Sequence, residues 1–218
     1  MNSSIRKRSL SGWLKKEHNQ EFHSKLKLQK FLFFYESLSK IEDNGSEEFR
    51  SLKGYVNGPV FSDVYGDYTY EYEDFVTNIE ETYEVHTDIV NKDRAKFSGF
   101  LVEILNEEEL SELTHELNIW NCKRDEIDRG VKHVPLNGED LNSQDTELLV
   151  SLREMYPTEY IDSVKVIKVS DKSFILNNED IEKITEEQRN VFYTLAEDNT
   201  LDNPVYISIS DDGVILVD

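Results

Sequence analysis

The sequence predicts an α+β protein, with a mostly helical N-terminal domain and a C-terminal α+β extension of two hairpins and two helices. Three observations lead to this prediction. Residues 26–38 (LKLQKFLFFYESL) place apolar side chains at the 3, 4, 7 spacing of one helical face. Residues 92–105 and 107–117 have the same helical period. Residues 164–176 and 205–217 instead contain short apolar runs separated by turn residues, which is typical of β-hairpins.

The first helices are predicted from their caps. Within the basic segment 1–23, a short helix carries Leu10, Trp13 and Leu14. Ser24 is a suitable N-cap for the central helix, which should continue to about Glu42 and stop at Asp-Asn-Gly (43–45). We expect the lysines in its first half to lie on the solvated face, away from the apolar side chains.

The next segment approaches a Gly-Pro turn. Residues 49–56 are short and apolar enough to be a strand or an extended connection. Pro59 suits the first position of a helix, and Gly58 tolerates the tight entry before it. We therefore expect a short helix against the central one, with inner side chains at 3 and 4 spacing: Val60, Phe61, Val64 and Tyr65.

Residues 66–84 interleave tyrosines with carboxylates. The alternation of Tyr68, Tyr70 and Tyr72 has period 2, so a solvent-edged strand competes with an irregular loop. The segment is either an ordinary solvated acidic surface or a recognition surface, because tyrosine gives contact area at low entropic cost and carboxylates select a basic partner. The candidate partner-binding residues are Tyr68, Tyr70, Glu71, Tyr72, Glu73 and Asp74.

The second half of the chain contains further helices and a long connection. A core helix is expected at 92–105, and Asn106 should open the next one, at 107–117. Residues 121–142 contain glycine and proline and are predicted to be a connection. The chain is therefore divided into a basic N-terminal segment (1–23), a helical domain (24–139) and an α+β subdomain (140–218).

The elements of the subdomain are predicted from its capping and turn residues. Ser143 should cap a helix that reaches Met155 and ends before Pro157, and Asn178 should cap a second helix. The two hairpins turn at Ser-Asp-Lys-Ser (170–173) and at Asp-Asp-Gly (211–213).

Charge restricts the classes of partner. The net charge is −21, although residues 1–30 alone carry +6. Direct binding to nucleic acid is disfavoured, because phosphate contacts require lysine and arginine. The basic start is expected to be a solvated face that attracts the acidic remainder; its lysines are Lys7, Lys15, Lys16, Lys25, Lys27 and Lys30. With no apolar run of membrane-span length and one cysteine, we expect a cytoplasmic protein with no membrane partner.

Three motifs together resemble the Panacea domain family, which includes SocA-type antitoxins and proteolytic adaptors and many phage-associated proteins. The first is Lys-Leu-Gln-Lys-Phe-Leu-Phe-Phe (27–34), the second Asn-Gly-Pro-Val (57–60) followed by Val-Tyr (64–65), and the third Leu-Ser-Glu-Leu-Thr-His-Glu (110–116) with a downstream Trp. The residues that carry the resemblance are Lys27, Gln29, Lys30, Gly58, Pro59, Val60, Tyr65, Thr114, His115 and Trp120. The match covers just under half of the chain, and residues 140–218 lie outside it.

The resemblance implies a compact helical module that acts by binding protein. Members neutralise a toxin directly or, as adaptors, deliver it to a Clp-type protease. We therefore expect an antitoxin-like module whose partner is a basic toxin, and which acts by occluding a site on that toxin and not by enzymatic turnover. The alternative is a phage anti-defence inhibitor whose acidic surface mimics nucleic acid and binds a nuclease or another basic defence protein.

Catalysis and cofactors are not expected. His115 lies between Thr114 and Glu116, but adjacent helical residues point about 100° apart, so neither neighbour can orient the ring. We expect it to hydrogen-bond the loop carrying Gly58 or the segment near Trp120. A nucleophilic pair with Cys122 has no glycine turn to form an oxyanion hole. The histidines lack metal-ligand spacing, and phosphate-binding glycine loops are absent.

Overall fold

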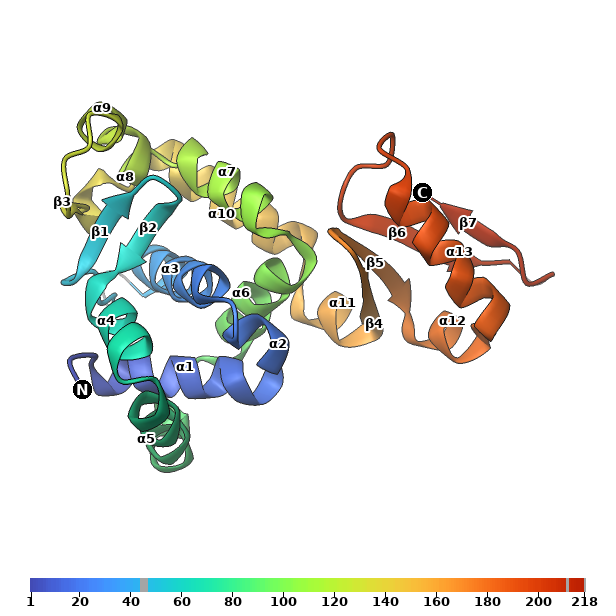
Figure 1. The fold of residues 1–218 in the computed structure, drawn as a ribbon, viewed down its shortest axis with the longest axis horizontal. Coiled ribbons are helices and arrows are strands. Elements are labelled where there is room, and N and C mark those ends of the chain that lie inside the picture. The colour runs from blue at the N-terminus through green and yellow to red at the C-terminus, as the bar shows by residue number, and fades with distance from the viewer. Residues whose placement is uncertain (44–46, 211, 218) are drawn as a thin grey trace.

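The computed structural model describes residues 1–43, 47–210 and 212–217, and these form two lobes (Figure 1). The α+β fold class is confirmed. The first lobe comprises α1 (Ile5–Glu17), α2 (Asn19–Phe22), α3 (Lys25–Glu42), β1 (Leu52–Tyr55), β2 (Gly58–Phe61), α4 (Ser62–Tyr70), α5 (Tyr72–Val85), η1 (Thr87–Ile89), α6 (Lys92–Ile104), α7 (Glu107–Glu116), α8 (Asn118–Asn121), α9 (Arg124–Asp128), β3 (Val134–Pro135), η2 (Gly138–Asp140) and α10 (Ser143–Met155). The second comprises α11 (Thr158–Ser163), β4 (Val164–Val169), β5 (Lys172–Asn177), α12 (Asn178–Lys183), α13 (Glu186–Glu197), β6 (Val205–Ile209) and β7 (Ile215–Val217).

Helix α3 is the centre of the first lobe, and it contacts α1, α4, α6, α7 and β2 (Figure 1). It begins where predicted, with the Ser24 side chain accepting from the Lys27 amide. Its last residue is Glu42, and Asn44 and Gly45 of the predicted stop lie outside the described residues. Apolar side chains cover most of its circumference, so neighbouring elements enclose it on all sides.

The basic N-terminal segment is built into this core. Arg6 forms a two-point ion pair with the buried Glu36 of α3, at 2.8 and 3.0 Å. Lys7 is 2% exposed and donates to Asp63 at 2.9 Å. The expectation of a solvated lysine face is therefore wrong for Lys7, although its attraction to the acidic part of the chain is as expected.

The prediction that Pro59 begins a helix is wrong. Strands β1 and β2 form a hairpin with a two-residue turn, in which Leu52 pairs with Phe61, and the helix begins only at Ser62. Burial of these two side chains against the core outweighs the preference of proline for a helix start. A third strand, β3, formed within the predicted connection, pairs with β1 on its other side.

Strand β2 is the edge of this sheet, yet it offers few main-chain donors. Proline at 59 has no N–H, and the N–H of Phe61 donates to the side chain of Gln29 at 2.7 Å. The edge is thereby closed by a proline and by a side chain from α3, two ordinary ways in which proteins protect edge strands.

The period-2 prediction for the tyrosine segment is also wrong. Helices α4 and α5 cover it, separated at Glu71, whose backbone leaves the helical region. Phe75 and Ile79 are buried four residues apart and Val64 is buried on α4, so the segment follows the helical period of its aliphatic and Phe residues. The alternating tyrosines do not lie on one strand face.

The second lobe is a four-stranded sheet in the order β4-β5-β6-β7, with antiparallel outer pairs and a parallel pair β5–β6. Both predicted hairpins are present, and Asp211 of the second predicted turn lies outside the described residues. Two cap predictions were wrong by one residue, since Asn142 caps α10 and Asn177 caps α12. The single helix expected after Asn178 is two helices, because the chain becomes extended at Ile184 and Thr185 caps α13.

The two lobes share some packing and several polar contacts. Leu149 of α10 and Ile175 of β5 both belong to the core cluster of the first lobe. Across the junction, the Asn203 side chain donates to the Ile104 carbonyl at 2.9 Å, and Lys96 pairs with Asp162 at 2.6 Å. A second, smaller core lies wholly within the sheet lobe, around Phe174 and Phe192.

Candidate functional site

The motif residues from three distant segments meet around the β1–β2 hairpin. The Gln29 side chain holds the Phe61 amide, and the Trp120 indole donates to the Tyr55 carbonyl at 3.0 Å. Lys30 reaches the hairpin turn from α3 and donates to the Asn57 carbonyl at 2.5 Å. These side chains therefore fix the position of the hairpin against α3 and α8.

Lys30 is a buried amine in this arrangement, which the sequence prediction of a solvated lysine missed. Its side chain is 1% exposed, and it also donates to the Thr114 hydroxyl at 2.6 Å. No carboxylate pairs with it among the described residues. Burial lowers the pKa of Lys30 to about 7. Gly58 lies directly over the amine with φ of 105°, where any side chain would collide with it.

His115 packs against Trp120, and its ring hydrogen-bonds the main chain of Val56 in the turn that leads to Gly58, as expected. The two rings are stacked with centroids 3.8 Å apart and an angle of 22° between their planes. Burial lowers the pKa of His115, and the positive charges of Lys30 and Arg124 add to this effect. A neutral ring stacked on an indole gives this histidine a packing role beside the hairpin.

A groove of about 690 Å³ runs between α3, the hairpin and α4, and we call it the hairpin groove. Its walls contain several motif residues together with neighbours that the sequence analysis did not single out. They are Lys25, Leu26, Gln29, Lys30, Tyr55, Val56, Asn57, Pro59, Val60, Tyr65, Glu107 and His133. Lys27 lies on another side of α3, where it donates to the Val102 carbonyl at 2.7 Å.

The predicted partner-binding residues lie at the junction of α4 and α5. Tyr70 is 82% exposed, and Glu71, Tyr72, Glu73 and Asp74 are exposed beside it. We call these five residues the acidic tyrosine surface. Tyr68, which was predicted with them, is instead half-buried.

The carboxylates of the acidic tyrosine surface are largely unbalanced. Glu73 and Asp74 have no ion pair within the described chain, and Glu71 has only the N-terminal amino group at 3.8 Å. The nearby Asp67 differs, because it is fully buried and accepts from the main-chain N–H groups of Asn2 and Ser3. No sequence pattern pointed to this role of Asp67.

Aromatic contacts connect the acidic tyrosine surface with the hairpin groove. Tyr72 meets Tyr68 edge to face, with ring centroids 5.0 Å apart. The Lys25 ammonium lies 5.8 Å from the Tyr68 ring and 4.8 Å from the ring of Tyr65, which lines the groove. The two areas are therefore joined by contacting side chains.

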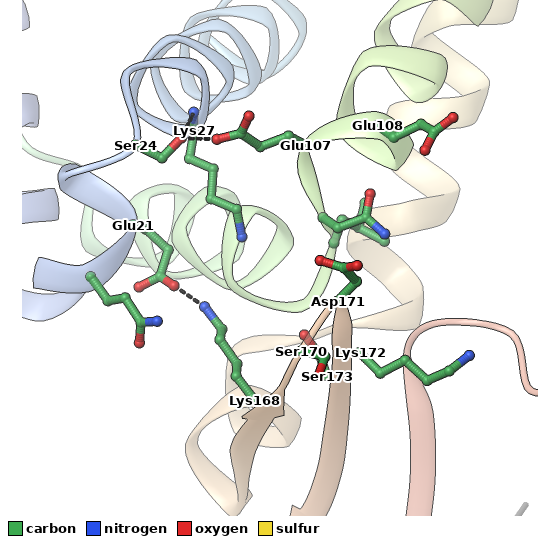
Figure 2. A pocket seen from close by; sticks show the side chains of 13 residues that line it. Glu21, Ser24, Lys27, Glu107, Glu108, Lys168, Ser170, Asp171, Lys172 and Ser173 are labelled. Carbon is green, nitrogen blue, oxygen red and sulfur yellow. Dashed lines mark hydrogen bonds and ion pairs between the residues drawn. The ribbon is translucent and has the colours of Figure 1, made fainter. Parts of the chain in front are cut away.

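A second cavity, of about 570 Å³, lies at the junction of the lobes (Figure 2). Lys168 of β4 points across it to an ion pair with Glu21 of α2, and burial lowers the pKa of Lys168 to about 8. Glu107 accepts from the Ser24 hydroxyl at 2.5 Å on the opposite wall. The ion pair between Lys168 and Glu21 links the two lobes, and no sequence pattern predicted it.

The described residues were also searched for a metal site and for a membrane-spanning helix. They contain no group of three or more side chains placed to hold a metal ion. Among the described helices, none combines the length and the apolar character that a bilayer crossing requires. Comparison of the chain with protein-family models, with curated proteins and with solved structures finds no match.

Proposed function

We propose that this chain is an antitoxin-like, cytoplasmic protein-binding module, which neutralises a basic partner toxin by direct non-covalent binding. The observation that carries the proposal is the acidic tyrosine surface, where Tyr70, which is 82% exposed, lies beside Glu73 and Asp74, two carboxylates without a cationic partner among the described residues. Tyrosine is enriched at protein interfaces, and charge complementarity accelerates and orients association. Occlusion of a basic surface on the toxin is the proposed mechanism.

The rigid support of this surface favours the same proposal. Phe75 and Ile79 anchor α5 in the core, and Asp67 fixes the end of α4 to the N-terminus. A surface held by buried side chains loses little conformational entropy when a partner binds. In a second role, the same complex would present a bound toxin to a Clp-type protease.

The first experiment is an affinity pull-down of the tagged chain co-expressed with its neighbouring gene, followed by mass spectrometry. The expected result is one stoichiometric small protein that is toxic when expressed alone and harmless when co-expressed. Recovery of a nuclease or a defence complex would contradict the antitoxin proposal.

The second experiment reverses three charges, with Glu71, Glu73 and Asp74 replaced by Lys. Affinity for the toxin should fall roughly 100-fold, at about 1 kcal/mol for each reversed charge. The matched control replaces three exposed carboxylates elsewhere on the first lobe by Lys: Glu112, Glu116 and Glu154. Both variants should keep their helical circular dichroism. Equal weakening by both would show that only total charge matters.

A second candidate function has its own observation in the structure. Exposed carboxylates follow the length of α5, namely Glu73, Asp74, Glu80, Glu81 and Glu84. Such a row is suited to mimicry of nucleic acid by a phage anti-defence inhibitor. A mimic would compete with duplex DNA for a basic nuclease, and this competition would fall steeply with added salt.

A further inference from the structure

The hairpin groove has two hydrogen-bond donors on one turn of α3. The Gln29 side chain is 2% exposed, and its Nε2 has no hydrogen-bond partner among the described residues, while its Oε1 is occupied by Phe61. Lys25, four residues earlier, has only aromatic rings beside its ammonium group and no carboxylate partner within the described chain. Residues four apart on a helix lie on the same face.

The chemistry of these donors indicates a carboxylate. A buried amide N–H without a partner costs free energy that an acceptor would recover, and an ammonium next to it favours a charged acceptor. The groove lining includes the carboxylate of Glu107, but this group already accepts a hydrogen bond from the Ser24 hydroxyl.

The rest of the groove indicates what carries the carboxylate. Leu26, Val56, Pro59 and Val60 supply apolar wall, and 690 Å³ lies within the range of pockets that enclose small ligands or short segments of chain. A peptide cannot join the sheet here, because β2 has no free donor at Pro59 or Phe61. Recognition must therefore come from side chains that hold one end of an apolar segment.

We propose that the hairpin groove binds the C-terminal residues of the partner protein, with the terminal carboxylate accepting from Gln29 Nε2 and Lys25 Nζ. This inference rests on the proposed function, and the aromatic contacts through Tyr65 and Tyr68 place the groove beside the acidic tyrosine surface. A partner that fits that surface is basic, so its main-chain terminus is a better source of the carboxylate than an acidic side chain. The apolar walls require apolar final residues.

The test uses fluorescein-labelled peptides that end in Val, Leu, Ile or Phe, each made as the free acid and as the C-terminal amide. Fluorescence anisotropy should show binding of the free acids and at least about tenfold weaker binding of the amides, the loss expected for one charge-assisted hydrogen bond. Hexanoate should compete poorly, because it lacks the peptide body.

Two variants and one control locate the binding in the groove. Gln29→Glu keeps an oxygen for the Phe61 N–H and replaces the free donor by an acceptor, and Lys25→Glu reverses the rim charge without touching the core. Each should weaken free-acid binding at least about tenfold. Lys16→Glu is the matched control, since Lys16 is an exposed lysine over a different tyrosine, Tyr83, and should leave binding unchanged.

Equal binding of acids and amides, or no peptide binding at all, would overturn the groove proposal. Competition by hexanoate as strong as that of the peptides would overturn the peptide occupant in favour of a small acid. The proposed function is tested separately, by toxin capture with the charge-reversed acidic tyrosine surface. Loss of toxin capture in that variant with no peptide binding in the groove leaves the proposed function standing and removes this inference alone.

Discussion

Substitution of Gly58 by Ala tests the buried contact that holds the hairpin turn. A Cβ at this position would lie 2.1 Å from Lys30 Nζ and 2.6 Å from Thr114 Oγ1. The backbone, at φ of 105°, adds strain of about 1–2 kcal/mol for a residue with a side chain. Displacing the amine breaks two hydrogen bonds, at about 1 kcal/mol each. Together these effects should lower the free energy of unfolding by about 3–4 kcal/mol.

Urea denaturation followed by circular dichroism measures this loss, and Gly130→Ala is its control. Gly130 also has a positive φ, of 80°, but nothing lies within 4 Å of the position of its Cβ. The control should therefore lose only about 1–2 kcal/mol, which is the strain alone. Equal destabilisation by the two substitutions would refute the role assigned to the contact with Lys30.

Three other predictions concern the same lobe. Burial lowers the pKa of Lys30 to about 7, so above that pH Lys30 keeps its proton in the unfolded chain and loses it in the folded one. The free energy of unfolding should therefore rise from about pH 7 to pH 9. In Lys30→Met this part of the rise should be missing, as measured by urea denaturation at each pH. Burial raises the pKa of Asp67, but hydrogen bonds from Ser3 and Asn2 outweigh it and hold the pKa below its ordinary value. Stability from Asp67 is therefore present above about pH 4 and lost as the pH falls further, and an acid titration of Asp67→Asn should lack this loss. Trp120→Phe removes the hydrogen bond to the hairpin carbonyl and should cost about 1–2 kcal/mol in thermal or urea denaturation, with a normal helical spectrum.

Helix boundaries were the part of the fold that local sequence determined best. Ser24 and Asn106 cap their helices as expected, because a cap requires only one side chain and the next turn of backbone. The hairpin at Gly58 was missed because strand pairing depends on a distant core, which outweighs the local preference of proline. The alternation of the tyrosines led to a wrong strand prediction for a similar reason. The burial of Phe75 and Ile79 in the core determines the helix, and the spacing of the tyrosines does not.

The exposed residues of the candidate site could be predicted from the sequence, whereas its buried hydrogen bonds could not. Glu71, Glu73 and Asp74 were expected to be exposed and are. The buried amine of Lys30 was not expected, because a lysine at this position of a helix is ordinarily solvated, and its acceptors come from two segments far along the chain. Motif residues identified the right neighbourhood, but their hydrogen bonds became visible only when the three segments were brought together.

The closed edge of β2 has a consequence for how this protein can acquire partners. Binding by strand addition draws its affinity from main-chain groups, which every polypeptide shares, and selectivity must then be added to it. Here proline and a glutamine side chain leave no free main-chain donor at Pro59 or Phe61 on that edge. At this edge, partner choice therefore depends on side chains alone, and a few substitutions there could redirect the proposed binding to a new partner while the scaffold beneath stays the same.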